Sequence, residues 1–324
     1  LTSLAVEVSG EDQLEGFRPG RRSYEVETLG ESVLVRTVTG DPGSEVSYQL
    51  EQSGLLFDAG VIGICGGEVG VPIPIGRSVL KLSVTWGGEV GRYAVVFTRG
   101  QVFSWTEQGI IQAAAAGGGP HGFDCDAPTT VVVRAEIAPL YDVMLDGEGK
   151  LSIESAGWER LFFVRAGVTV ELARLELSKG SADDGGALYN EGRAKLIDVR
   201  IANNQASERG GGVYSAPGSE LILEGVTVAD NVASGTGEAA GGGLYLVDAT
   251  TFIRNSVVET NVARGRSARS GRRARGGGLF VSGGALYVED SRIASTSAIG
   301  GDGSGDVETA GYARGGGLHL IDAT

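Results

Sequence analysis

The sequence Gly185-Gly186-Ala187-Leu188-Tyr189 decides the fold, because it is the first of five copies of one phrase in the second half of the chain. Each copy is a glycine run followed by an aliphatic and then an aromatic residue, with histidine in the aromatic position of the last copy. The later copies are Gly211-Gly212-Val213-Tyr214, Gly242-Gly243-Leu244-Tyr245, Gly277-Gly278-Leu279-Phe280 and Gly316-Gly317-Leu318-His319. A repeat of this length with a fixed internal order is typical of a solenoid.

A second motif lies between the glycine runs and places an asparagine three residues after an aliphatic residue. Its copies end at Asn204, Asn231 and Asn261, with a degenerate copy at Thr296. Each copy is followed two residues later by an alanine, namely Ala206, Ala233, Ala263 and Ala298. We expect the asparagines to stack at a turn, where each amide can bond its neighbours above and below and where asparagine tolerates a left-handed backbone.

The local chemistry of the repeats favours strands over helices. Stretches such as Leu196 to Ile201 and Leu221 to Val228 are rich in aliphatic and β-branched residues and are bounded by turn-forming residues. Strands without intervening helices indicate a parallel β-helix, in which equivalent positions stack coil upon coil. The expected interior ladders are Leu188, Val213, Leu244, Leu279 and Leu318; Leu196, Leu223, Ile253 and Val288; and Ile201, Val228, Val258 and Ile293.

Composition limits the class of protein. The chain has 324 residues, 55 of them glycine, and a formal net charge of −14. This charge argues against a general nucleic-acid binder, and no apolar run is long enough to predict a membrane span. The two cysteines, Cys65 and Cys125, leave two interpretations open, either one bridge or two free thiols.

The ends of the sequence suggest a longer protein. Leu1-Thr2-Ser3-Leu4 has the pattern of a strand rather than of a secretory signal, so we expect that a signal was removed or that this is one piece of a longer chain. At the other end Thr324 falls within a coil. We therefore expect the solenoid to continue, or its open end to stack on another subunit as a homo-oligomer or filament.

Residues 1–100 have the pattern of an antiparallel β-sandwich. The alternating segments are Leu4 to Val8, Ser23 to Glu27, Ser32 to Thr39, Glu45 to Leu50, Ser78 to Thr85 and Tyr93 to Thr98. The segments Leu1 to Val6, Tyr24 to Val26, Asp41 to Val46 and Tyr93 to Arg99 resemble the cadherin-like module of bacterial surface proteins, which implies a spacer or adhesive unit. Gly54 to Gly70, which contains Cys65, departs from that module.

Residues 101–122 are expected to form a linker and a capping helix. Ser104-Trp105-Thr106-Glu107 has the spacing of a capping box, and the helix is expected to stop at Gly117-Gly118-Gly119-Pro120. Such a helix would cover the open first coil.

Residues 123–324 are assigned to the β-helix. The run through Phe123-Asp124-Cys125 and Leu145-Asp146-Gly147 into Gly185-Gly186-Ala187-Leu188 resembles extracellular bacterial domains that are right-handed parallel β-helices. The glycine-aliphatic phrase and Phe252-Ile253-Arg254-Asn255 are similar to the repeats of the polymorphic outer-membrane proteins. That likeness covers residues 104–324, and it implies an extracellular or cell-surface location.

The repeats lengthen along the chain. The aliphatic residues that close successive glycine runs lie 25, 31, 35 and 39 residues apart. Almost all of the added length falls between the alanine that follows the asparagine motif and the next glycine run. Insertions confined to one face of a solenoid commonly mark its binding face, so we expect a glycan or protein partner there.

One long loop is rich in arginine, and the next is acidic. The arginines are Arg264, Arg266, Arg269, Arg272, Arg273 and Arg275. They favour an anionic partner such as an acidic polysaccharide. In the alternative interpretation, the neighbouring loop neutralises them through weak exposed pairs with Asp302, Asp306 and Glu308.

The acidic loop also has the alternation of a calcium loop. Asp302, Ser304, Asp306 and Glu308 place oxygen atoms at every second position. The loop lacks the glycine that a calcium loop carries at its sixth position, so a solvated acidic loop is the other interpretation. No other cofactor is predicted.

Tyr189, Tyr214, Tyr245, Phe280 and His319 share one position of the repeat. Since neighbouring side chains of a strand alternate, this column is expected to point outward and either to support sugar rings or to form a partly covered stack. Trp86, Trp105 and Trp158 are expected to anchor the core or the junction.

Catalysis is the alternative function. A polysaccharide lyase or hydrolase on this scaffold needs clustered carboxylates on one strand face. Asp183-Asp184 is the nearest approach to such a cluster, but the later coils do not repeat the acidic pair. We therefore predict a secreted or cell-surface structural or adhesive protein.

Overall fold

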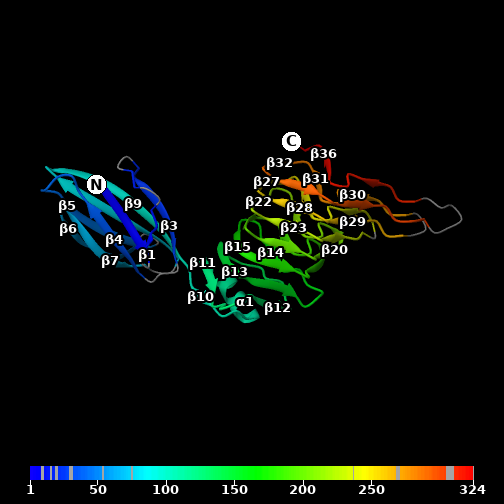
Figure 1. The fold of residues 1–324 in the computed structure, drawn as a ribbon, viewed down its shortest axis with the longest axis horizontal. Helices are drawn as coiled ribbons and strands as arrows, with labels where there is room; N and C mark the ends of the chain where they lie inside the picture. The colour runs from blue at the N-terminus through cyan, green and yellow to red at the C-terminus, as the bar shows by residue number, and fades with distance from the viewer. Residues whose placement is uncertain are drawn as a thin grey trace. The chain divides into compact units, whose positions relative to one another are not determined.

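The structure of the chain is a computed structural model, and it describes residues 1–8, 11–14, 17–18, 21–28, 32–52, 55–73, 76–235, 237–267, 271–303 and 310–323. The chain forms two compact units. The first comprises residues Leu1–Val102 and Gly118–Gly122, and the second comprises Phe103–Gly117 and Phe123–Thr324. The all-β fold expected from the sequence is confirmed (Figure 1).

The first unit is a β-sandwich of two sheets. One sheet has the order β2-β1-β4-β7 and the other β3-β9-β8-β5-β6, with every pair antiparallel except β3 and β9. The strands are β1 (Ser3–Val8), β2 (Glu11–Asp12), β3 (Ser23–Thr28), β4 (Ser32–Val38), β5 (Glu45–Gln52), β6 (Leu55–Ile64), β7 (Gly66–Pro72), β8 (Gly76–Trp86) and β9 (Glu89–Arg99). Inward residues from both sheets, such as Val6, Val35, Leu82 and Phe97, form one buried core.

The stretch Gly54 to Gly70, for which the sequence offered no template, supplies one strand to each sheet. The two strands are β6 and β7, and Cys65 connects them with a positive φ of 66°. Gly66 follows with a φ of 106°, and a Cβ atom there would lie 2.2 Å from the Thr37 carbonyl oxygen. The glycines of this stretch therefore form a tight corner between the sheets.

Both cysteines are free thiols. Cys65 is exposed, whereas Cys125 is buried, and burial, together with the nearby Asp124 carboxylate, raises the pKa of the Cys125 thiol. We expect a water-soluble disulfide reagent at about pH 8 to label one thiol per folded chain rapidly, because the thiolate is the reactive form. Labelling before and after unfolding, with a Cys65→Ser variant as control, measures this. Rapid labelling of folded Cys65→Ser would contradict it.

The second unit begins with the helix α1 (Glu107–Ala116). Thr106 is its N-cap, with its Oγ1 accepting a hydrogen bond from the Gly109 amide, so the expected cap at Ser104 is wrong by two residues. Glu107 instead accepts bonds from the backbone amide and guanidinium of Arg134. The helix ends at Gly117 as expected, with a φ of 64°.

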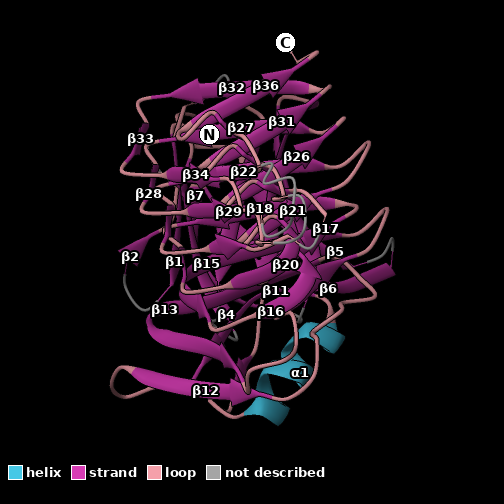
Figure 2. Cartoon of the chain, turned by 90° about the vertical axis from the view of Figure 1, so that its right-hand side faces the viewer, coloured by secondary structure: helices cyan, strands magenta, loops and turns pink. Residues whose placement is uncertain are grey.

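The helix covers the first coils of the solenoid. Ile110, Ala113 and Ala114 are buried in the same core cluster as Val133 and Ile153. Figure 2 shows α1 at one end of the solenoid, beside β12 (Thr129–Val133). This is the capping role expected for such a helix. Two short strands, β10 (Val102–Phe103) and β11 (Gly118–Phe123), flank it in sequence and pair with each other.

Every coil of the solenoid adds strands to three parallel sheets, which we call the first, second and third faces. The first face is built from β14 (Phe162–Val164), β17 (Leu188–Asn190), β21 (Val213–Ser215), β26 (Leu244–Val247), β31 (Leu279–Ser282) and β36 (Leu318–Ile321). The glycine-aliphatic-aromatic phrase therefore enters this face at the same point of each coil.

The second face starts at β12, β13 (Val143–Ser155) and β15 (Thr169–Ser178) and then divides into two columns of strands. One column is β18 (Arg193–Ile197), β22 (Glu220–Glu224), β27 (Thr250–Arg254) and β32 (Ala285–Glu289). The other is β19 (Arg200–Ala202), β23 (Thr227–Ala229), β28 (Val257–Glu259) and β33 (Arg292–Ala294).

The third face carries two short strands in each later coil. Its members are β16 (Ser181–Asp184), β20 (Gln205–Arg209), β24 (Val232–Ala233), β25 (Ala239–Ala240), β29 (Val262–Arg264), β30 (Ala274–Arg275), β34 (Ser297–Ile299) and β35 (Ala313–Arg314).

All three expected ladders are confirmed by the strand register. Leu188 pairs with Val213, and the column continues through Leu244 to Leu318. The ladder that begins at Leu196 and the one that begins at Ile201 follow the same rule. Within these columns Leu188, Val213 and Leu244 are fully buried, whereas Val288 and Leu318, in the last described coils, are exposed.

The asparagine ladder is also confirmed, with one correction. Asn204 Nδ2 donates to Asn231 Oδ1, and Asn231 Nδ2 donates to Asn261 Oδ1, each at 2.9 Å. The left-handed residue, however, is the one before each ladder asparagine: Asn203, Asp230 and Thr260 have φ values of 58°, 56° and 53°. The turn conformation and the buried amide are therefore supplied by two different residues.

One interior position breaks the apolar pattern. Thr251 stands in the column between Leu221 and Leu286, is fully buried, and its hydroxyl has no hydrogen-bond partner among the described residues. Thr251→Val is expected to raise the free energy of unfolding by about 1 kcal/mol, because it removes an unsatisfied buried polar group. Denaturant unfolding measures the change, with the exposed Thr250→Val as a matched control. A fall in stability for Thr251→Val would contradict this account.

Candidate functional site: the loop edge

The insertions leave the solenoid along one line within the third face, between the two short strands that each later coil adds to it. We define the loop edge as residues 234–238, 265–273 and 300–312, which connect β24 to β25, β29 to β30 and β34 to β35. Figure 1 shows the later of these segments projecting to one side of the solenoid, beyond β29 and β30. The structure thus places the added length where the spacing of the repeats predicted it.

The bases of the loops are built like the solenoid itself. The short strands on either side of each loop pair with their counterparts one coil away. Ala239, Ala263 and Ala274 are fully buried in a small separate apolar cluster, with Ala298 packed against it. Alanine fits here because only a small side chain lets the outgoing and returning strands approach.

Backbone contacts continue this order into the loops. The Arg266 amide donates to the Gly235 carbonyl at 3.2 Å, and the Gly301 amide donates to the Arg272 carbonyl at 2.8 Å. A Cβ atom on Gly271 would lie 1.9 Å from the Gly301 carbonyl oxygen. Successive loops are therefore stacked on one another through glycine, and their side chains have a fixed support.

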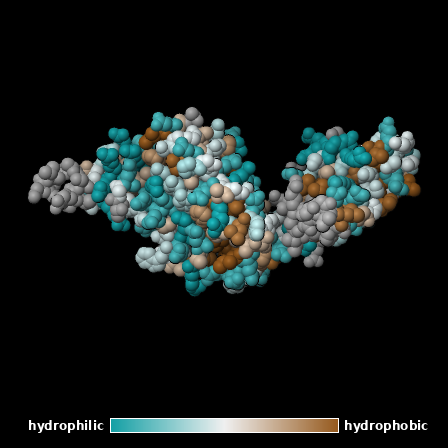
Figure 3. Space-filling view, turned by 180° about the vertical axis from the view of Figure 1, so that it is seen from behind, coloured by the Kyte–Doolittle hydropathy of each residue, from teal (hydrophilic) through white to brown (hydrophobic). Residues whose placement is uncertain are grey.

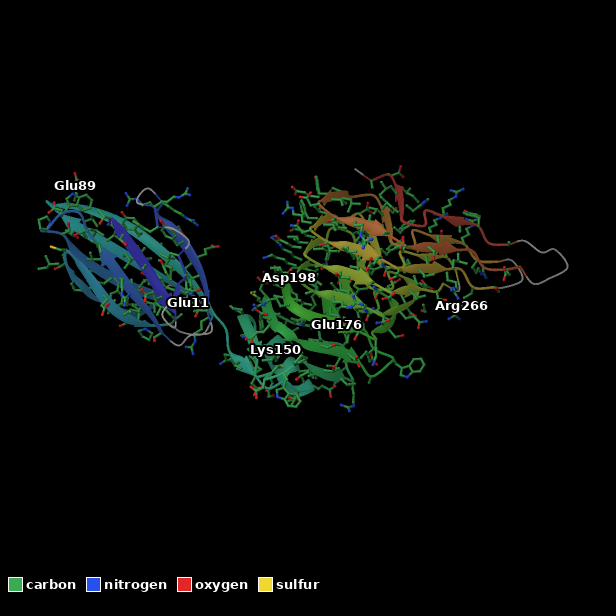
Figure 4. All side chains as sticks on the ribbon, viewed as in Figure 1. Glu11, Glu89, Lys150, Glu176, Asp198 and Arg266 are labelled. Carbon is green, nitrogen blue, oxygen red and sulfur yellow. The ribbon has the colours of Figure 1, made fainter. Side chains whose placement is uncertain are left out.

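Three of the exposed arginines lie on these supported loops, and Arg264 ends the strand β29 that leads into one of them. Arg264, Arg266, Arg272 and Arg273 are exposed, and none forms an ion pair with a carboxylate of the described residues. Figure 4 shows Arg266 on the projecting side, well away from Glu176 and Asp198 on the body of the solenoid. We call Arg264, Arg266, Arg272 and Arg273 the arginine segment.

Two arginines of this region make contacts with neighbouring loops. Arg275 forms an ion pair with Glu238 of the preceding loop, and it is the one pair between described loops that fits the neutralisation interpretation. Arg273 also stacks over the Tyr312 ring, 4.6 Å from its centroid. Arg269 lies outside the described residues. The neutralising role of Asp306 and Glu308 stays a prediction, because both also lie outside them.

The structure describes only one of the four residues that the sequence predicts as calcium ligands. Ser304, Asp306 and Glu308 lie outside the described residues, and Asp302 is the only predicted ligand within them. The Asp302 amide donates to Ser267 Oγ at 3.2 Å, which ties this loop to the one before it. Among the residues that the structure describes, no group of three or more His, Cys, Asp or Glu side chains is placed to hold a metal ion.

The aromatic column forms a continuous stack on the first face. The ring centroids of Tyr189 and Tyr214 lie 4.7 Å apart, those of Tyr214 and Tyr245 5.1 Å, and those of Tyr245 and Phe280 4.8 Å. His319 continues the stack above Phe280 at 5.5 Å. Each inner ring therefore has a neighbour on both faces, and a sugar ring has no free face of these residues to lie on. The partly covered stack is the interpretation that these distances fit.

Arginines cover the stack from the loop side. Arg209 lies over the Tyr214 ring at 5.2 Å and makes two bonds to Asp184, at 2.8 and 2.7 Å. Arg160 covers Tyr189 at 4.8 Å. Burial raises the pKa of Tyr214 to about 12, against the opposing effect of Arg209. Asp184 is thus paired with an arginine, and Asp183 accepts a hydrogen bond from the Ser207 hydroxyl.

Comparison of the chain with models of known protein families, with curated proteins and with solved structures found no match. The function is therefore argued from the site alone. Among the described residues no helix has the length and apolar character needed to cross a membrane.

A groove that the sequence did not predict lies at the start of the loop edge. It has a volume of about 500 Å³ and is lined by Glu136, Trp158, Glu159, Arg160, Ser181, Ala182, Asp183 and Ser207. Trp158 is 88 % exposed, so the expectation that it anchors the core or the junction is wrong. We call this the Trp158 groove. The signal in the sequence was the polar turn around the indole, since Gly157 and Glu159 flank it.

Proposed function

We propose that this chain is a secreted or cell-surface structural or adhesive protein that presents its loop edge to an acidic glycan. The observation that carries the proposal is the arginine segment: four exposed guanidinium groups, without a carboxylate partner in the described part of the chain, on loops that stack by backbone hydrogen bonds. Guanidinium groups bind carboxylate and similar oxyanions through two parallel hydrogen bonds.

The support beneath the segment favours binding over mere solubility. Because backbone hydrogen bonds hold the described parts of these loops, their backbone loses less conformational freedom when a ligand binds. Figure 3 shows a solenoid surface on which hydrophilic side chains predominate and apolar ones gather in a limited area. Charge is therefore the property by which this edge is expected to select a partner.

The family assignment belongs to the same proposal. We infer that the sandwich is a cadherin-like module and that the solenoid belongs with the repeats of the polymorphic outer-membrane proteins. The Phe252-to-Asn255 phrase supports this: Phe252 stacks on Tyr287 at 4.9 Å on the outer surface, and Asn255 forms a turn with a φ of 48°. Immunolabelling of intact cells against the native protein tests the location, and labelling only after lysis would overturn it.

Binding to a carboxylated and a sulfated polysaccharide tests the ligand class. We expect the wild-type chain to bind both, and we expect Arg264→Glu/Arg266→Glu/Arg272→Glu to bind at least about tenfold more weakly, the loss of about 1.4 kcal/mol. The charge-matched control replaces Arg92 on β9, Arg165 after β14 and Arg193 on β18 by glutamate, and none of the three belongs to the loop edge. An equal loss of affinity in the control would show that net charge, and not the arginine segment, determines binding. Binding of an acidic protein but of neither polysaccharide would show that the ligand is a protein and not a glycan.

A further inference from the structure

Two features of the Trp158 groove both favour a cation. The exposed indole of Trp158 offers the aromatic face that attracts a cation most strongly. Glu159 and Asp183 line the same groove, and neither has a cationic partner among the described residues. Asp183 is held in place by the Ser207 hydroxyl, which donates to its Oδ1. An aromatic face and two carboxylates in one depression are suited to an arginine or lysine side chain.

The other charges that line the groove are already matched. Arg160 Nη1 lies 2.6 Å from Glu136 Oε2, and Arg160 also donates to the carbonyl oxygens of Asp184 and Gly185. This arginine is therefore fixed by three groups and is not available to neutralise Glu159 or Asp183. The groove keeps a local negative charge that an incoming cation would offset.

The chain itself carries a ligand of this chemistry. The arginine segment holds exposed guanidinium groups on loops of the same edge, several coils further along the solenoid. A guanidinium plane can stack on an indole and at the same time bind a carboxylate with two hydrogen bonds. We propose that the arginine segment of one copy binds in the Trp158 groove of a second copy.

The contact joins two different patches, which decides the form of the assembly. Each copy in a pair still has one unused groove or one unused segment, so further copies can add at either end. Repeated addition gives a row of copies, which is a different assembly from the end-to-end stacking expected from the sequence. It uses the same arginines as the proposed glycan site, so a polyanion is expected to compete with it.

Sedimentation of the 324-residue chain tests the contact. Wild-type protein is expected to form dimers and larger species as the concentration rises toward about 100 µM, the range in which a small charged interface gives measurable association. Trp158→Ala and Arg264→Glu/Arg266→Glu/Arg272→Glu are each expected to stay monomeric. Mixing the two variants is expected to give a one-to-one complex and nothing larger, because only one intact groove-to-segment contact can form.

The matched control is Trp105→Ala, since Trp105 is also exposed, at 48 %, but lies at the start of α1. It is expected to associate like the wild type. Wild-type protein that stays monomeric, association that survives Trp158→Ala, or a mixture that forms no complex would each overturn the proposal. Trp158→Ala should still bind polyanions, whereas the arginine variant should not, so failure of this contact and failure of the glycan proposal give different results.

Discussion

Asn231→Ala is expected to lower the free energy of unfolding of the solenoid by about 3 kcal/mol. Asn231 is fully buried, and its Oδ1 accepts bonds from the backbone amide and the side-chain amide of Asn204, at 3.0 and 2.9 Å. Its Nδ2 donates to the Ile201 carbonyl and to Asn261. The substitution leaves the buried backbone amide of Asn204 without its acceptor and removes three further bonds, those to the Asn204 side chain, the Ile201 carbonyl and Asn261.

Denaturant unfolding monitored by far-ultraviolet circular dichroism measures this change. The matched control is Asn203→Gly, which removes an exposed asparagine of the equivalent turn one coil earlier and introduces a residue that tolerates its φ of 58°. Asn203→Gly is expected to change stability by less than about 0.5 kcal/mol. An Asn231→Ala loss no larger than that of the control would show that the amide ladder is not a main source of stability.

Gly242→Ala is expected to lower the free energy of unfolding by about 3 to 5 kcal/mol, as much as Asn231→Ala or more. Here the cause is a steric clash and not the loss of hydrogen bonds. A Cβ atom at Gly242 would lie 2.3 Å from the Gly277 carbonyl oxygen and 2.4 Å from the Val262 carbonyl carbon. Both atoms belong to the backbone of the next coil, so no flexible side chain can move aside. The added methyl group is expected to separate two coils at the point where the first face begins.

Gly237→Ala is the control for this substitution, because no atom lies within 4 Å of its added Cβ and its φ is not positive. It is expected to leave the midpoint of the unfolding transition unchanged or to raise it slightly, since alanine reduces the conformational freedom of the unfolded chain. The midpoint and the slope of the denaturation curve distinguish the two variants. Equal midpoints for Gly242→Ala and the wild type would mean that the coils adjust to the methyl group.

The ladders were predictable because one side chain per repeat carries the signal. Leu188, Val213 and Leu244 keep the same offset from their glycine runs, so the loops inserted elsewhere did not obscure the register. The glycine runs were predictable from the sequence, but the structural reason for each glycine is visible only in the fold. The first of each run, such as Gly241, has a positive φ, while the second, such as Gly242, lies against the next coil.

Other features depended on contacts that no local pattern encodes. The aromatic column was placed correctly, but its cover comes from Arg160 and Arg209, whose guanidinium positions follow from Asp184 and nearby carbonyl groups. Trp158 is a large apolar residue, and composition alone assigns such a residue to the interior. Only the position of its turn at the loop edge shows that it faces solvent.

The amide ladder also gives the solenoid a direction. Asn204 and Asn231 each donate one bond to the asparagine of the coil that follows, and the row starts at Gly180, whose backbone amide donates to Asn204 Oδ1 at 2.8 Å. Aligned donors polarise one another, so every coil laid down strengthens the bonds already made beneath it. Coils can therefore be added to this ladder in one orientation only, because a reversed coil would place an amide donor where the ladder needs an acceptor.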